Sequence, residues 1–311
     1  INTYFIIFYQ IFSHTLMYSK TDIKTTEINN NNPSGLYIVS TPIGNKYDIS
    51  LRAIDILKKA DQMICEDTRT TKNLFRILGL ECKKKKWISY NDHNASKKIV
   101  TLLKIIENGS ISVLVSDAGT PLISDPGYKL VKAVKDRGLY VTTIPGACSI
   151  ISSLVISGLK SDKFSFVGFL PKNKNNYIKT IRNFSSLKST LIIFEKPSRV
   201  IDLLLVVKEN FEMYKVVIVN EISKLHEKTI SIDQNNINKV IENFVTLKGE
   251  VTVLLEINRS LKKNTFSDTL LLKELKNFKP SQVATIVSKK TSESRESVYK
   301  RCIILLKKNA K

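Results

Sequence analysis

The sequence predicts an α/β protein in which two α/β domains are followed by a small helical domain. Its 311 residues suit two domains of about 150 residues each, or two with a smaller third. From Leu36 onward, short apolar runs alternate with segments whose apolar residues recur at helical spacing, which is typical of mainly parallel sheets covered by helices. Stretches 158–163 and 259–265 have few apolar residues. They predict domains over residues 35–159, 160–258 and 259–311.

Residues 1–34 are expected to be a disordered or non-native extension. The run 21–34 is polar and includes four consecutive asparagines, a composition typical of disorder. The apolar stretch 4–12 has no Lys or Arg ahead of it and makes a poor signal peptide. Met17 is the candidate natural start.

The first domain opens with an apolar strand at 36–40. Ser50 then stands where it can cap a helix that carries Leu51, Ile54 and Leu57 on one face, so these residues form a β-then-α unit. Further strands are predicted at 62–65, 87–90, 111–116 and 140–144. Further helices are predicted at 70–78, 96–107, 128–137 and 148–157.

The second domain is predicted to contain strands at 164–167, 190–195, 216–221, 228–232 and 251–257. Its helices are predicted at 177–185, 199–210 and 236–244. Because the last three strands have only one helix between them, antiparallel pairing is expected there.

The basic tail divides into helices at 269–278, 282–288 and 298–306. Pro280 and Ser281 form a typical start for the middle helix. The polar turn at 289–293, between the middle and last helices, is typical of a helix-turn-helix. A plain helical appendage that packs on the body is the alternative.

Composition excludes several protein classes. With 42% hydrophobic and 25% charged residues, the chain is an ordinary globular protein, and no apolar run reaches the ~18 residues that indicate a membrane span. The four cysteines, Cys65, Cys82, Cys148 and Cys302, form no CxxC pair. The sequence therefore predicts no metal site, no membrane partner and a reducing cytoplasmic location.

The net charge of +21, from 49 basic against 28 acidic residues, raises the encounter rate with phosphate polyanions. The chain is also crowded with Lys, Asn and Ile, as an A- and T-rich genome would produce. The charge alone does not choose between these two explanations.

Three segments rich in glycine and proline follow predicted strands, at 41–45, 117–127 and 145–147. Ligands of open parallel sheets bind beyond the carboxyl ends of the strands, so these loops are expected to line one rim. Proline removes backbone donors and leaves carbonyl groups, which suit a cation. The chain has neither GxGxxG nor a phosphate loop ending in Gly-Lys-Ser/Thr, which argues against hydride and phosphoryl transfer.

Several motifs, in chain order, resemble the tetrapyrrole methylase superfamily, and within it the branch that methylates cytidine 2′-oxygens of small-subunit rRNA. These motifs are Thr41-Pro42-Ile43-Gly44-Asn45, Glu66-Asp67-Thr68-Arg69, Asp92-His93-Asn94, the run 115–127, Gly168-Phe169-Leu170-Pro171, Phe194-Glu195-Lys196-Pro197-Ser198-Arg199 and Asn220-Glu221-Ile222-Ser223-Lys224. The resemblance covers residues 35–311. The chain departs from the family pattern in two places. Ala147 stands where the family commonly has the last proline of Pro-Gly-Pro, and Lys196-Pro197 alters a turn of the family pattern.

The resemblance implies that S-adenosylmethionine binds in a cleft between two α/β domains. The implied cofactor-binding residues are Pro42, Ile43, Gly44, Asp117, Ala118, Gly119, Thr120, Pro145, Gly146, Cys148 and Ser149. Asp117 is expected to accept hydrogen bonds from the ribose or amino groups of the cofactor. The alternative is that it caps a helix or forms an Asx-turn.

A ribose hydroxyl is a poor nucleophile while it keeps its proton, so a positioned base favours methylation. The candidates for this catalytic role are His93, Glu66, Asp67 and Glu221. His93 has an unperturbed pKa near neutrality, although a lone histidine is more often structural. Asp67 can instead pair with Arg69, and Glu221 can lie with its neighbours Lys224 and Glu227 on a solvated strand edge.

The implied partner is 16S rRNA in the small ribosomal subunit, and superfamily membership implies a homodimer. Candidate phosphate contacts are Lys83 to Lys86, Lys172, Lys174, Lys179, Arg182 and the tail's Lys289, Lys290, Arg295, Lys300, Arg301, Lys307 and Lys308. Two other functions stay open at this point. One is C-methylation of a tetrapyrrole such as a precorrin, and the other is a noncatalytic RNA-binding module.

Overall fold

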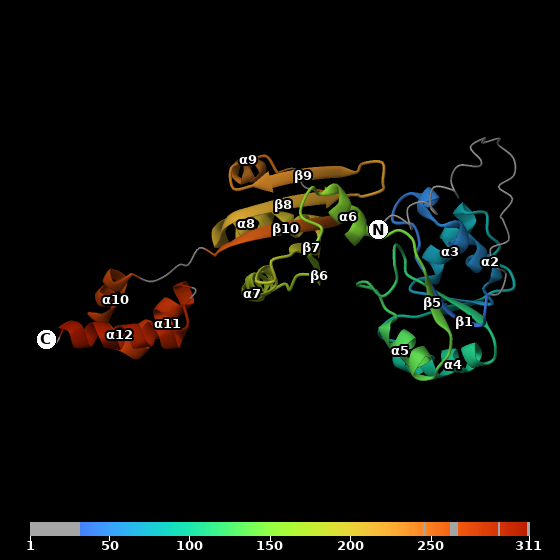
Figure 1. The fold of residues 1–311 in the computed structure, drawn as a ribbon, viewed down its shortest axis with the longest axis horizontal. Coiled ribbons are helices and arrows are strands. Elements are labelled where there is room, and N and C mark those ends of the chain that lie inside the picture. Colours follow the sequence, from blue (N-terminus) through green and yellow to red (C-terminus); the bar gives the residue numbers. More distant parts are fainter. Residues whose placement is uncertain (1–31, 245–246, 262–266, 292, 310–311) are drawn as a thin grey trace, which may run out of the picture.

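The computed structural model describes residues 32–244, 247–261, 267–291 and 293–309. Two five-stranded sheets and three C-terminal helices follow one another along the chain, and Figure 1 shows these three parts in a row. All but the last three residues of the expected extension, 1–34, lie outside the described residues. The predicted α/β class with a helical tail is confirmed.

The first sheet is parallel throughout, with strand order β3-β2-β4-β1-β5. Its strands are β1 (Gly35–Val39), β2 (Gln62–Cys65), β3 (Lys86–Ser89), β4 (Ile111–Val115) and β5 (Val141–Ile144). The three strands that precede the Gly/Pro loops, β4, β1 and β5, are neighbours in this order. Their carboxyl ends therefore meet at one edge of the sheet.

Helices cover both faces of this sheet. They are α2 (Leu51–Lys59), α3 (Thr68–Ile77), α4 (Ala95–Glu107) and α5 (Tyr128–Asp136). Alternate strand residues face opposite sides: Val113 packs with Leu57 of α2 and Phe75 of α3, whereas Leu114 packs with Leu103 of α4 and Leu130 of α5. Strands buried on both faces explain why the sequence shows continuous apolar runs here.

The second sheet is mixed, with strand order β6-β7-β10-β8-β9. Its strands are β6 (Phe164–Phe169), β7 (Thr190–Glu195), β8 (Phe211–Asn220), β9 (Lys228–Asp233) and β10 (Val251–Leu261). Only the pair β6 and β7 is parallel. The expected antiparallel pairing of the last three strands is confirmed.

Helices of the second half pack on one face of this sheet, and α6 (Ser149–Ile156) packs on the other. The first face buries side chains of α7 (Lys174–Ser185), α8 (Val200–Asn210) and α9 (Ile237–Glu242). On the opposite face, Ile150 and Leu154 of α6 contact Ile192 and Leu254. The helix that follows the first sheet thus belongs to the core of the second sheet, and the division of the chain at residue 159 stays a prediction.

The tail forms its own small core. Helices α10 (Asp268–Leu275), α11 (Pro280–Lys290) and α12 (Arg295–Asn309) bury Leu271, Val287 and Cys302 together. The predicted helix start at Pro280 is confirmed, because this residue opens α11. In the described part of the chain, no helix is long and apolar enough to cross a membrane.

Most predicted elements lie within a few residues of their expected places, and two differences have clear causes. Ser50 caps α2 as expected, since its hydroxyl accepts a hydrogen bond from the Ala53 amide. Strand β8 begins five residues before the expected 216, because Phe211 and Tyr214 are buried while the residues between them are exposed. A short 3-10 helix at Lys46–Asp48 was not expected, and the Asn45 side chain caps it.

Candidate active site

A cavity of about 420 Å³ lies between the two sheets, within the range of about 300–1,000 Å³ typical of small-molecule sites. The first half of the chain contributes the loops after β2 and β4 and the start of α6. The second half contributes the ends of β6 and β7, the turn after β8 and the start of β10. The cavity is therefore built by both halves.

The three Gly/Pro loops are joined by hydrogen bonds at this edge. Thr41 and Gly119 exchange two backbone bonds of 2.9 and 3.1 Å. The Thr120 hydroxyl donates to the Ala147 carbonyl at 3.1 Å and lies 2.9 Å from the Ser40 hydroxyl. Loops from three different strands are thus fixed relative to one another, which is the pre-organisation that a ligand site needs.

Two glycines allow these loops to approach closely. Gly119 has a φ of +77°, and a Cβ there would lie 3.1 Å from Ile43 Cγ2. At Gly146 a Cβ would lie 2.9 Å from Ser40 Cβ. Larger residues at either position would push the loops apart or strain the backbone.

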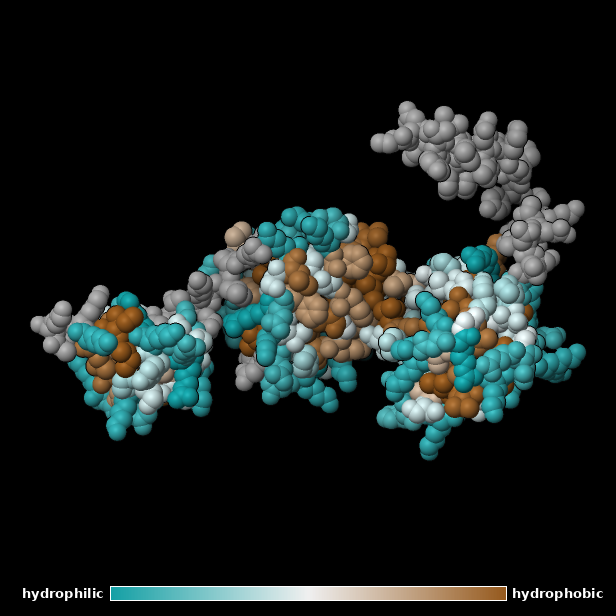
Figure 2. All heavy atoms as spheres, turned by 60° about the horizontal axis from the view of Figure 1, so that its bottom comes forward, coloured by the Kyte–Doolittle hydropathy of each residue, from teal (hydrophilic) through white to brown (hydrophobic). Residues whose placement is uncertain are grey.

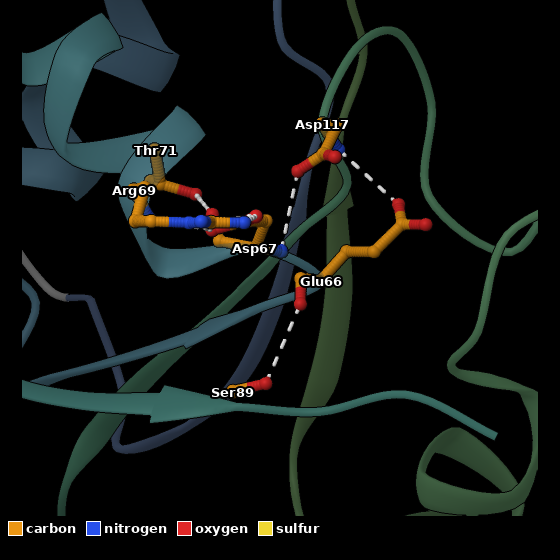
Figure 3. A network of polar contacts seen from close by, with 6 residues as sticks. All are labelled: Glu66, Asp67, Arg69, Thr71, Ser89 and Asp117. Carbon is orange, nitrogen blue, oxygen red and sulfur yellow. Dashed lines mark hydrogen bonds and ion pairs between the residues drawn. The ribbon is translucent and has the colours of Figure 1, made fainter. Parts of the chain in front are cut away.

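Three of the carboxyl groups that line the cavity, of Glu66, Asp117 and Asp125, come from the first half of the chain. Figure 3 shows two of them: the Asp117 amide donates to Glu66 Oε2 at 3.4 Å, and the Asp67 amide donates to Asp117 Oδ1 at 3.2 Å. Burial raises the pKa of all three carboxyls above the ordinary values, and their mutual repulsion raises the pKa of Glu66 and Asp125 further. A cation bound in the cavity would stabilise the ionised carboxylates against both their burial and their mutual repulsion.

Asp67 lies close to these three carboxyl groups, but its own carboxylate is occupied by hydrogen bonds within the first half. Its carboxylate caps α3 and accepts hydrogen bonds from the backbone and guanidinium of Arg69, at distances of 2.6 to 3.1 Å. These bonds lower the pKa of Asp67 to about 2. Figure 3 shows the Arg69 side chain turned toward Asp67. The structure therefore contains the Asp67–Arg69 pair that the sequence left as an alternative.

Glu195, at the end of β7, forms the opposite wall with a fully buried carboxylate (0% exposed). It accepts hydrogen bonds from the Lys196 amide at 2.8 Å and from the Tyr177 hydroxyl at 3.4 Å. The Arg199 guanidinium lies 3.5 Å away. The buried charge is thus compensated from three sides.

The structure brings eight of the predicted site residues to the cavity wall. They are Ile43, Glu66, Asp117, Ala118, Gly119, Thr120, Cys148 and Ser149. Pro42, Gly44, Pro145, Gly146, His93, Asp67 and Glu221 are not among the residues that line the described cavity. The roles assigned to these fifteen residues stay predictions.

Two of the residues outside the cavity wall have other contacts. Gly44 lies against the turn after β8, where a Cβ would lie 2.4 Å from Lys224 Cγ. Glu221 accepts hydrogen bonds from Lys224 Nζ at 2.8 Å and from the Glu250 amide at 2.9 Å, and these bonds lower its pKa. Gly44 thus lies at the contact between the two halves, whereas these bonds of Glu221 stay within the second half. His93 is exposed, in the turn before α4.

Sequence reasoning missed several lining residues. They are Asp125, Phe169, Phe194, Glu195, Lys196 and Glu250. Most of them lie in motifs that the sequence analysis noted, and Glu195 and Phe169 end the strands β7 and β6. The rule that ligands bind beyond strand ends would have found these two, had it been applied to the second sheet as well.

The family model of the tetrapyrrole (corrin/porphyrin) methylases matches residues 35–235, which include every residue predicted for the site. The chain belongs to the tetrapyrrole methylase family.

Curated members of this family resemble the chain over most of its length. A protein of Rickettsia prowazekii named "Ribosomal RNA small subunit methyltransferase I" is 42% identical, over 72% of this chain and 79% of that protein. A protein of the same name from Mesorhizobium japonicum is 34% identical over 87% of this chain and 92% of its own. The predicted ribosomal branch of the tetrapyrrole methylase family is thereby confirmed as the group of relatives.

Solved structures show the same fold. The uroporphyrin-III C-methyltransferase of Thermus thermophilus, complexed with S-adenyl homocysteine, aligns with a TM-score of 0.50 over 71% of this chain and 97% of that one. At 17% identity, this likeness concerns the fold of tetrapyrrole methylases alone.

The residues of this tetrapyrrole methylase cavity fit S-adenosylmethionine. The carboxyl groups that the first half contributes, of Glu66, Asp117 and Asp125, suit the positively charged sulfonium and ammonium groups of that molecule. Apolar side chains such as Ile43 and Ile150 suit its adenine ring. The cavity is large enough for one such molecule.

Proposed function

We propose that this chain methylates the ribose 2′-oxygen of a cytidine in 16S rRNA of the small ribosomal subunit, in the cytoplasm, with S-adenosylmethionine as methyl donor. The observation that carries the proposal is the 34–42% identity, over most of the chain, to proteins named for methylation of small-subunit rRNA. The acidic cavity between the two halves favours a positively charged methyl donor. The net charge of +21 supports a polyanionic acceptor.

Asp117 and the loops around it would hold the methyl donor. When bound, S-adenosylmethionine supplies a methyl group on a positively charged sulfur, ready for in-line displacement. Asp117 would accept hydrogen bonds from its ribose or amino groups, and Ile43, Ala118 and Ile150 would exclude water around it. Because the loops are joined by hydrogen bonds, the methyl carbon would be held in one direction, and alignment carries much of the rate of such a displacement.

Glu66 is the base that we assign among the four candidates. It lines the cavity, and burial together with nearby carboxylates raises its pKa, which improves a carboxylate as a proton acceptor. Its Oε2 would accept the proton of the 2′-hydroxyl as the ribose oxygen forms its bond to the methyl carbon, while the bond from that carbon to sulfur would break and release the neutral thioether. Asp67, with its pKa near 2, would be a much weaker base.

The deciding experiment is methyl transfer from labelled S-adenosylmethionine to small subunits purified from a bacterial strain that lacks the enzyme. We expect label on one ribose 2′-oxygen, located by mapping ribose methylation across the rRNA. Absence of transfer to these subunits would remove the proposal. A spectral change on incubation with precorrins, without RNA methylation, would establish the tetrapyrrole alternative. Absence of a heat of binding for S-adenosylmethionine in calorimetry would favour the noncatalytic alternative.

We also propose that the chain forms a homodimer. The support is α6, which packs on the second sheet through Ile150 and Leu154 but leaves Ile151 and Val155 exposed, Val155 to 74%. Figure 2 shows hydrophobic surface on the middle part of the molecule. Light scattering is expected to give the mass of two chains, and the mass of one chain at micromolar concentration would contradict the proposal.

A further inference from the structure

An aromatic side chain is exposed at the mouth of the cavity. Phe169 lines the cavity yet is 58% exposed, whereas Ile43 and Ile150 of the same cavity are buried. Its ring lies 5.8 Å from the ring of Phe194, centroid to centroid, and Phe194 in turn lies 4.9 Å from Phe166. Phe169 is thus the most exposed of three rings that meet edge-on or tilted, and it offers ring surface to solvent.

A β-bulge in β6 gives Phe169 this position. Phe166 pairs with Ile192 and Gly168 pairs with the next residue, Ile193, so that Val167 is an extra residue. In a regular strand Phe166 and Phe169 would point to opposite faces, because they are an odd number of residues apart. The bulge brings both rings beside Phe194. Gly168 permits it, with a φ of +72° that other residues rarely adopt.

The turn after Phe169 is tied to the wall of the cavity. Arg199 donates to the carbonyl of Leu170 at 3.3 Å and to that of Pro171 at 2.9 Å, and it faces the buried Glu195. The aromatic ring therefore stands on a fixed backbone although its own surface is open. An aromatic ring with open surface on a fixed backbone can stack against a flat partner such as a nucleobase.

A positively charged side chain shares the cavity wall with the ring. Lys196 is exposed and lines the same cavity, directly after Glu195 and two residues after Phe194 in the chain. The Gly168 backbone is also close to the first half, since a Cβ there would lie 3.8 Å from Ser124 Oγ. The ring thus stands where both halves and a cationic side chain meet.

We propose that Phe169 is the platform on which the nucleobase of the target nucleotide stacks, and that Lys196 contacts a phosphate next to that nucleotide. This inference rests on the proposed function and adds the residues that select its substrate. Single-stranded or splayed-out bases are recognised by stacking on aromatic side chains, with a basic residue nearby for the backbone. The arrangement orients the ribose of the stacked nucleotide toward the cavity.

The test compares variants of two phenylalanines on the same strand. Phe164 is at the opposite end of β6, is 43% exposed and does not line the cavity, so Phe164→Ala is the matched control. Phe169→Ala is expected to raise the KM for small subunits from the strain lacking the enzyme by about 5- to 150-fold, the range for loss of one stacked base. Phe169→Tyr is expected to keep the KM near the wild-type value, and Phe169→Leu to raise it as alanine does.

Binding of S-adenosylmethionine, measured by calorimetry on the same variants, separates the platform from the methyl-donor site. Unchanged affinity in Phe169→Ala is expected. Weaker donor binding with an unchanged KM for subunits would assign the ring to the methyl donor and overturn the proposal. An equal effect of Phe164→Ala, or full activity of Phe169→Leu, would also overturn it. If the wild-type protein methylates no subunits, the proposed function itself fails, which is a different result from an active enzyme indifferent to residue 169.

Lys196→Gln provides an independent arm. Loss of one phosphate contact is expected to reduce the slope of log affinity against log salt concentration by about 0.7 to 0.9, measured by subunit binding at several salt concentrations. An unchanged slope would overturn the assignment of Lys196.

Discussion

Replacement of Asp117 by alanine is expected to weaken binding of S-adenosylmethionine by about 10- to 150-fold, the range for loss of a hydrogen bond to a charged group. Asp117 lines the cavity, and its carboxylate accepts a hydrogen bond from the Asp67 amide at 3.2 Å through one oxygen, Oδ1. The remaining acceptor capacity is available to the ligand. Because Asp117 is largely accessible to solvent and only partly desolvated, the free energy of unfolding is expected to change by about 0.5 kcal/mol or less.

Asp92→Asn is the control for this variant. Asp92 is exposed on the same side of the first sheet and does not line the cavity, and its replacement removes one negative charge as well. Donor affinity within twofold of wild type is expected for Asp92→Asn. Equal loss in both variants would show that net charge, and not the contact at Asp117, controls binding.

The pH dependence of donor binding gives a second readout of the same site. Burial raises the pKa of Glu66, Asp117 and Asp125, so in the free protein they ionise in a pH window above that of ordinary carboxyl groups. A cation binds the ionised forms, and affinity is therefore expected to rise with pH through this window. The stability of the free protein is expected to change with pH in the opposite direction. These groups contribute stability below their unfolded pKa values, and that contribution is lost as pH rises through the raised folded values. Flat donor affinity across the window would contradict the role of the carboxylates.

Local sequence patterns predicted most of the helices and strands, because the side chains buried in the hydrophobic cores follow those patterns. The apolar run that buries Val113 on one face of the sheet and Leu114 on the other is visible in the sequence, and so is the cap at Ser50. Loops 41–45 and 117–127 could be assigned to one edge because parallel strands place their carboxyl ends together.

Other parts of the site depend on contacts between distant segments. The bulge that turns Phe169 toward Phe194 arises from pairing of β6 with β7, and no local pattern marks Val167 as the extra residue. The second wall of the cavity requires that α6 pack on the second sheet, although it follows the first in sequence. The sequence therefore predicted one wall of the cavity in detail and left the other nearly undescribed.

Replacement of Arg199 by alanine is expected to have the largest effect on stability, because it leaves the carboxylate of Glu195 buried without its cation. Removal of one partner of a buried ion pair costs about 3–5 kcal/mol, and the Glu195 side chain is fully buried 3.5 Å from the guanidinium. The same guanidinium holds the Leu170 and Pro171 carbonyls and lies 5.3 Å from the Tyr177 ring centroid. The free energy of unfolding in urea is the measurement.

Two comparisons distinguish this explanation from a general loss of contacts. Arg137→Ala breaks the half-exposed pair with Glu107, at 2.6 Å, and is expected to cost about 1 kcal/mol or less. Adding Glu195→Gln to Arg199→Ala removes the unpaired charge, so the double variant is expected to recover part of the lost stability. If the double variant recovers none of the lost stability, the Arg199 bonds to Leu170 and Pro171 are the dominant contribution. The arginine would then stabilise this wall mainly by fixing the turn that carries Phe169, and only secondarily by neutralising Glu195.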